Sequence, residues 1–247
     1  RAFRGTDDAD AFTSRIDLFF GGGTYDHGKA AAQGLTVPPW PPGEPPPDTL
    51  TAEDGTRLFP ERMGGETWRT DTFFGAALST FGICYNPDRL DDLGIARAPE
   101  RWRDLANPAL RGQVGVADPT KSGSIAKAFE MIVQAACHRA VAAAGFDRAA
   151  VDAFEARCRE AGWDPEQRPE GIPAAYQEAV ETGWRDGLNL VRRIGGNARY
   201  FTDAAGKVPV DVSAGDAAAG VAIDFYGRYQ AETSRAPDGT PRMVYRT

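Results

Sequence analysis

The chain has few of the residues that build metal clusters, disulfide frameworks and the common catalytic centres. Its 247 residues include three cysteines and two histidines, without the CxxC or Cys/His spacing of a structural zinc site. The sequence motifs GxSxG, HExxH and the phosphate-binding P-loop are also absent. The best-known hydrolase, zinc-protease and nucleotide-binding classes are therefore excluded, and we expect no catalytic residues and no enzyme.

An excess of positive charge and a long apolar run are missing as well. The formal net charge is -7 and the pI is near 5.0, which argues against a nucleic-acid partner. No run approaches the roughly 18 apolar residues of a membrane-spanning helix, and no secretion signal is visible in this sequence. The 42% hydrophobic and 26% charged residues are typical of a globular chain that can bury a core.

The three cysteines are Cys84, Cys137 and Cys158. Three buried thiols are the favoured interpretation, because a free cysteine behaves as a small buried hydrophobic residue. A Cys137–Cys158 disulfide stays open for an exported chain, because connectivity cannot be read from sequence.

Short strands alternate with helices along the chain, which predicts an α/β fold. Apolar runs predict a buried strand at 16–20, a strand, turn and strand over 72–86, and strands at 114–117 and 221–225. Helical spacing and capping residues predict helices at 87–94, from Ser122 or Ser124 onward, and over 174–194. We expect the last helix to pack through an apolar stripe of Tyr176, Val180, Trp184, Leu188 and Val191.

Prolines and glycines mark two loops in the first third of the chain. Seven of the 18 prolines lie between Pro38 and Pro47, which predicts a surface loop or, alternatively, a motif that binds a partner. Three glycines at 21–23 follow the predicted first strand, where the backbone can turn sharply or approach a ligand closely.

The stretch from Tyr85 to Ser124 carries the clearest functional signal. The short strand at 114–117 leads into Ser122-Gly123-Ser124, which opens a long helix. Free amides and the helix dipole favour an anion at such a helix N-terminus, although simple capping by a serine explains the same residues.

The order of motifs resembles the extracellular solute-binding proteins of ABC importers, the group of ferric-iron, phosphonate, thiamine and polyamine binders. Four segments carry this resemblance: DLFFGGGTYDHGKAAAQGL, TFGICYNPDRLDDLGI, RWRDLANPALRGQVGVADPTKSGS and AGKVPVDVSAGDAAAGVAIDFYGR. Together they span most of residues 16–230.

The resemblance implies a type II periplasmic-binding-protein-like fold, with two α/β lobes joined by crossover strands. Residues 1–82 with 226–247 would form one lobe and 83–225 the other, with a helical insert near 139–173. Relative to the family the chain looks truncated at both ends, so we expect the first lobe to be incomplete.

The resemblance also implies a ligand cleft between the lobes and a set of ligand-binding residues. They are Gly22, Gly23, Thr24, Tyr25, Thr80, Thr120, Ser122, Gly123, Ser124, Asp224 and Tyr226. Ferric members of the group use two neighbouring tyrosines, whereas this chain has Phe225-Tyr226 there. Tyr226 is therefore a weak metal ligand, because a ferric ion prefers several anionic oxygens, and we expect no cofactor.

The function implied is capture of a small organic anion and its delivery to an ABC transporter permease, by a monomer in the periplasm or outside the cell. The resemblance also allows a lipid anchor. Three alternatives stay open: a ferric-iron importer, an enzyme with Asp118 or Asp224 as general base, and a ligand sensor that uses the proline-rich loop.

Overall fold

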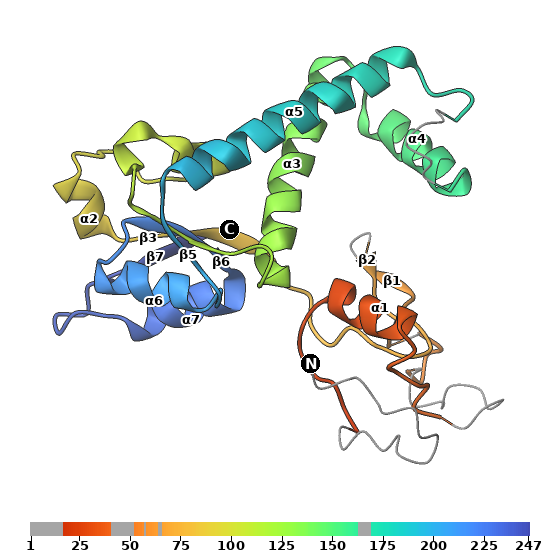
Figure 1. Ribbon diagram of the computed structural model, residues 1–247, viewed down its shortest axis with the longest axis horizontal. Helices are drawn as coiled ribbons and strands as arrows, with labels where there is room; N and C mark the ends of the chain where they lie inside the picture. The colour runs from red at the N-terminus through yellow and green to blue at the C-terminus, as the bar shows by residue number, and fades with distance from the viewer. Residues whose placement is uncertain (1–16, 41–51, 57, 64–65, 163–168) are drawn as a thin grey trace. The chain divides into compact units, whose positions relative to one another are not determined.

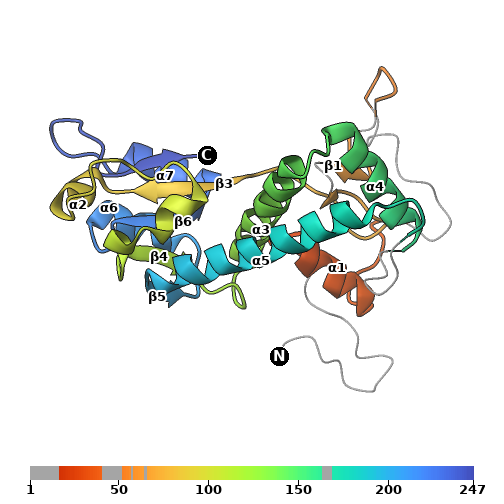
Figure 2. The ribbon, with the colours of Figure 1, turned by 90° about the horizontal axis from the view of Figure 1, so that it is seen from above.

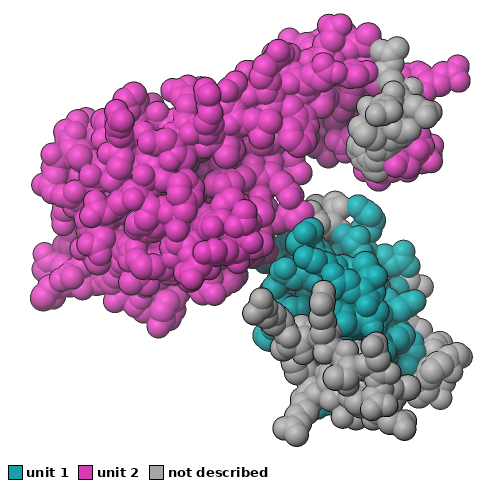
Figure 3. Space-filling model, in the orientation of Figure 1, with its two compact units in different colours: residues 1–78 teal, residues 79–247 magenta. Residues whose placement is uncertain are grey.

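The computed structural model describes residues 17–40, 52–56, 58–63, 66–162 and 169–247. The chain divides into two compact units, residues 1–78 and 79–247, which Figure 3 colours separately. Most of the proline-rich loop, residues 41–47, lies outside the described residues. No helix of the described part is long and apolar enough to cross a membrane.

The first unit contains helix α1 (Thr24–Ala32) and a short antiparallel pair, β1 (Arg62–Met63) and β2 (Glu66–Thr67). The predicted buried strand at 16–20 is wrong for its described part: residues 17–20 form no strand, and Leu18 and Phe20 are 77% and 81% exposed. A strand needs a partner for its backbone hydrogen bonds, and no described strand of this unit pairs with them.

The second unit is built on a mixed five-stranded sheet in the order β5-β4-β6-β3-β7 (Figure 1). Its strands are β3 (Phe81–Tyr85), β4 (Val114–Ala117), β5 (Ala198–Thr202), β6 (Ala219–Ile223) and β7 (Val244–Arg246). Strands β5, β4 and β6 are parallel, and β3 is antiparallel to both β6 and β7.

The helices of the second unit are α2 (Pro87–Asp92), η2 (Trp102–Ala106), η3 (Pro108–Leu110), α3 (Gly123–Ala143), α4 (Arg148–Glu160), α5 (Ala174–Gly196), α6 (Lys207–Ala214) and α7 (Asp224–Thr233). Helices lie on both faces of the sheet, whereas α4 lies away from it, beside the far ends of α3 and α5 (Figures 1 and 2). One core joins residues such as Leu105, Ile125 and Ile194 to the sheet, and a second core packs Val208 and Val212 of α6 against Cys84. Helices α3 and α5 thus lie on one face, and α6 and α7 on the other.

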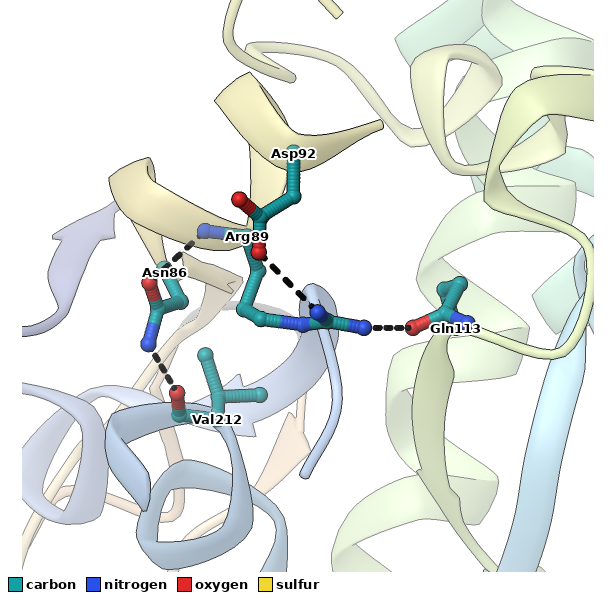
Figure 4. Close-up of polar contacts among 5 residues, drawn as sticks. All are labelled: Asn86, Arg89, Asp92, Gln113 and Val212. Atoms are coloured by element: carbon teal, nitrogen blue, oxygen red, sulfur yellow. Dashed lines mark hydrogen bonds and ion pairs between the residues drawn. The ribbon is translucent and has the colours of Figure 1, made fainter. Parts of the chain in front are cut away.

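Several predicted elements are confirmed because local signals fix them. Asn86 caps α2 by accepting from the amide of Arg89 at 3.1 Å, and Pro87 occupies the first helical position. Figure 4 shows that Asn86 also donates to the carbonyl of Val212 at 3.0 Å, while the Arg89 guanidinium reaches Asp92 and Gln113. The buried strand at 114–117 is confirmed as β4, whose four residues are all buried.

Helices α3 and α5 pack backbone to backbone through glycines. A Cβ atom on Gly183 would lie 2.3 Å from Cα of Cys137, and one on Gly187 would lie 2.7 Å from Cα of Val133. The predicted stripe of α5 is therefore wrong in part: Trp184 and Leu188 are more than half exposed. Small residues, rather than large apolar ones, form this contact because they let the helix backbones approach closely.

The segment between α3 and α5, near the predicted insert at 139–173, contains α4. A cluster of three aromatic rings holds it to the start of α5, with Phe146, Phe154 and Tyr176 at centroid distances of 4.9–5.9 Å.

The last residues of the chain pack within the second unit. Strand β7 pairs with β3, and Gly227 of α7 lies against the ring of Tyr245. Residues 226–247, which the resemblance places in the first lobe, are thus part of the second unit here. The lobe boundaries of the whole protein stay a prediction.

All three cysteines are free thiols, so the Cys137–Cys158 bridge that the sequence left open is not formed in this structure. The expectation of three buried thiols is confirmed for Cys84 and wrong for Cys137 and Cys158, which are partly exposed. The Cys137 Sγ atom faces the carbonyl of Val180 on α5 instead. Cys84 is fully buried, and burial raises the pKa of its thiol to about 12.

These environments predict selective labelling. At pH 8 a thiol reagent should modify Cys158 and Cys137 in the folded protein and reach Cys84 only after unfolding, since the thiolate is the reactive form. Peptide mass mapping measures the three sites separately. Equal labelling of Cys84 in the native protein would contradict the buried position of β3.

Candidate functional site

The carboxyl-terminal edge of the parallel strands gathers four connecting segments of the second unit. Strands β4, β5 and β6 end here at Ala117, Thr202 and Ile223. Phe81 at the start of β3 pairs with Ile223, so the incoming segment 79–80 lies at the same edge. In open α/β sheets, ligands bind outside such an edge.

The topology opens a crevice between two neighbouring strands at this edge. After β4 the chain passes to α3 on one face of the sheet, and after β6 it passes to α7 on the other face. Because β4 and β6 are adjacent and parallel, their connections diverge at a topological switch point. The N-termini of α3 and α7 flank this point (Figure 1).

The structure brings seven of the eleven predicted site residues to this edge. They are Thr80, Thr120, Ser122, Gly123, Ser124, Asp224 and Tyr226. The other four, Gly22, Gly23, Thr24 and Tyr25, lie in the first unit, where Thr24 begins α1 rather than a loop. The Asp26 carboxylate accepts from the amide of Gly23 at 3.2 Å, so this helix start is closed by its own side chain.

The start of α3 is open by comparison. Ser122 is the N-cap residue as predicted, but no side chain caps the helix. The first amides of a helix have no partner inside it. Gly123 is exposed and Ser124 half-buried, so their amides and two serine hydroxyls border the edge. This arrangement suits an anion.

The loop before α3 is held by Asp118. Its carboxylate accepts from both the amide and the hydroxyl of Thr120, at 2.9 and 2.7 Å. These hydrogen bonds, assisted by the charge of Lys121, hold the pKa of Asp118 below its usual range. Thr120 therefore serves this turn, and its hydroxyl proton is engaged.

The start of α7 differs from the predicted strand over 221–225. Strand β6 ends at Ile223 and Asp224 begins the helix, where a carboxylate favours the first turn. The Asp224 carboxylate accepts from the Ser79 hydroxyl, and its second oxygen lies 3.7 Å from Nε of Arg228. Ser79 could not be predicted as its partner from sequence, because the two residues are 145 positions apart.

Tyr226 is the one phenol of the predicted pair, and it is exposed beside Phe225, with ring centroids 4.4 Å apart. Its ring also lies against Gly206, just before α6. Among the described residues, no three His, Cys, Asp or Glu side chains gather in a way that could hold a metal ion.

The described residues also line cavities away from this helix start. One of about 430 Å³ in the first unit is lined by Trp40, Glu61, Arg62, Thr67, Arg69, Thr70 and Asp71. The other, of about 330 Å³, lies in the second unit beside β7 and is lined by Glu100, Arg228, Tyr245, Arg246 and Thr247. Arg228, the partner of Asp224, borders the second cavity.

A sheet edge with a switch-point crevice and an open helix start is a place where an anionic ligand can bind. The sequence model of the bacterial extracellular solute-binding proteins matches residues 53–236, so the chain belongs to this family. It is a family of binding proteins rather than of enzymes.

Individual relatives are more distant. An uncharacterized protein of Haemophilus influenzae is 28% identical over 127 residues, which are 51% of this chain and 34% of that protein. The periplasmic binding protein AfuA of Actinobacillus pleuropneumoniae, solved with fructose-6-phosphate bound, is 19% identical over 67% of this chain and 35% of its own, with a TM-score of 0.40. The spermidine/putrescine substrate-binding protein PotD of Streptococcus pneumoniae is 12% identical over 68% of this chain and 36% of its own, with a TM-score of 0.33.

The chain thus spans about a third of the length of these relatives. Likenesses this weak say nothing about its ligand.

Proposed function

We propose that this chain belongs to a protein that captures a small organic anion outside the cytoplasmic membrane and delivers it to an ABC transporter permease. The choice of an anionic ligand depends on one observation, the uncapped start of α3 at the switch-point crevice. Family membership supports the import role. The binding residues on this edge are the amides of Gly123 and Ser124 and the hydroxyls of Ser122 and Ser124.

Charge and chemistry support an organic anion over ferric iron. A ferric site needs several anionic oxygen ligands, and the edge offers one phenol, Tyr226. Of its three carboxylates, Asp118 is engaged by Thr120, Asp224 is paired with Ser79 and Arg228, and Asp203 is exposed. The exposed rings of Phe225 and Tyr226 instead offer an apolar surface to the organic part of a ligand. We accordingly propose a binding protein that needs no cofactor.

Thermal unfolding with a panel of ligands tests this proposal. Methylphosphonate, inorganic phosphate or acetate should raise the melting temperature, since a ligand that binds only the folded state stabilises it by mass action. Stabilisation at 100 times the dissociation constant amounts to about 2.7 kcal/mol. Ferric citrate is the opposing probe, with citrate alone as its control. A shift that requires iron, or no shift with any anion, would count against the proposal.

A further inference from the structure

The two units are linked by a short exposed segment, residues 76–78, and Gly75 just before it is packed in the first unit. The units divide after Leu78, and Ala76, Ala77 and Leu78 are exposed. Just before them, the amide of Gly75 donates to the carbonyl of Trp68 at 2.6 Å. A Cβ atom on Gly75 would overlap the Trp68 ring at 2.3 Å, so Gly75 is held within the first unit.

Directly after the segment, the chain is tied to the start of α7. The Ser79 hydroxyl donates to Oδ1 of Asp224, and the amide of Asp224 donates to the carbonyl of Thr80 at 3.0 Å. Regular pairing of β3 with β6 begins only at the next residue, where Phe81 faces Ile223. Asp224 is therefore the first group in the second unit that holds the incoming chain.

Both carboxylate oxygens of Asp224 are engaged. Oδ1 accepts from Ser79, and Oδ2 pairs with Arg228, which lies one turn later in α7. The side chain is 27% exposed. A carboxylate that is already paired with a cation, and that carries the same charge sign as an anionic ligand, is a poor contact for that ligand.

We infer that Asp224 is a positioning residue. It clamps residues 79–80 to the start of α7 through Ser79 and so confines the free link between the units to Ala76–Leu78; it does not contact the ligand. This reassigns a residue that the sequence places in the binding set. The inference rests on the proposed function only where it concerns the ligand, because the clamp itself exists in the free protein.

Hydrogen exchange of the ligand-free protein tests the clamp. Ser79→Ala and Asp224→Ala should each speed hydrogen exchange of the backbone amide at position 224 by about tenfold relative to its intrinsic rate. This is the effect expected when local stability falls by about the contribution of one hydrogen bond. The double variant should add little to the larger single effect, because both changes remove one interaction. Ser79→Thr keeps the hydroxyl and should behave like the wild type. Asp203→Asn, an exposed aspartate at the same edge, is the matched charge control.

Two results would overturn the inference. One is an exchange rate that does not change in Ser79→Ala, or that rises as much in Ser79→Thr as in Ser79→Ala. The other is a dissociation constant for methylphosphonate that rises more than tenfold in Asp224→Ala but not in Ser79→Ala, because this pattern marks Asp224 as a ligand contact. The clamp predicts equal and small changes in both variants, less than about threefold, since lengthening a link from three to five residues costs little.

The two readouts separate the clamp from the proposed function. If the exchange pattern appears but neither methylphosphonate nor any other anion binds, the clamp stands and the proposed function fails. If anions bind and the exchange pattern is absent, the proposed function stands and the clamp fails.

Discussion

Replacement of Ser122 by aspartate should lower the affinity for methylphosphonate more than about tenfold while leaving the protein folded. Two unit charges about 4 Å apart near a protein surface repel by about 4 kcal/mol, and each 1.4 kcal/mol is about a tenfold change in affinity. Aspartate is also a good N-cap residue, so α3, which has no side-chain cap now, should be at least as stable. Titration calorimetry measures the affinity and thermal unfolding the stability.

Ser122→Asn is the matched control. Asparagine has nearly the same shape as aspartate and a similar preference for the N-cap position, but it carries no charge. We expect it to keep most of the affinity, because the amides of Gly123 and Ser124 remain in place. Equal affinities in the aspartate and asparagine variants would place the anion away from the start of α3.

The second large effect concerns stability. Gly183→Ala should destabilise the protein by about 1–3 kcal/mol, the usual cost of overpacking, although alanine is the better helix former. The added Cβ would lie 2.3 Å from Cα of Cys137, and backbone cannot move aside as a side chain can. For a chain of this size each kcal/mol lowers the melting temperature by about 2–4 °C.

Gly196→Ala in the same helix gives the comparison. No heavy atom lies within 4 Å of a Cβ there, so this variant should be neutral or slightly more stable. If both alanine variants melt at the same temperature, the close packing of α3 on α5 is wrong.

The parts of the fold predicted from sequence are those with strong local signals. The Asn86-Pro87 pair started α2, the run at 114–117 became β4, and apolar spacing located α3 and α5. Elements whose existence depends on distant partners were missed. Strand β5 is five residues with partly exposed positions, and β7 is three residues that form only because β3 offers an edge.

The errors have the same origin. Leu18, Phe19 and Phe20 have the composition of a strand but pair with no described strand. Trp184 and Leu188 have the spacing of a packed stripe, but the contact uses the adjacent glycines. Local propensity cannot show which face of a helix a neighbour covers.

The candidate site divides in a similar way. Sequence located Ser122 at the start of α3, because a strand followed by serine and glycine is a local pattern. Sequence could not show that the Thr120 hydroxyl donates to the Asp118 carboxylate. It also could not show that Ser79 donates to the Asp224 carboxylate and that Arg228 pairs with it. The first-unit residues 22–25 stay a prediction as ligand contacts.

Native mass spectrometry with metal analysis of the gently purified chain tests solute binding most directly. We predict a small organic anion that is released on denaturation, or bound methylphosphonate after it is added, and in either case a much smaller bound fraction in Ser122→Asp. Stoichiometric iron in the wild-type sample, or no bound anion even after methylphosphonate is added, would contradict the account.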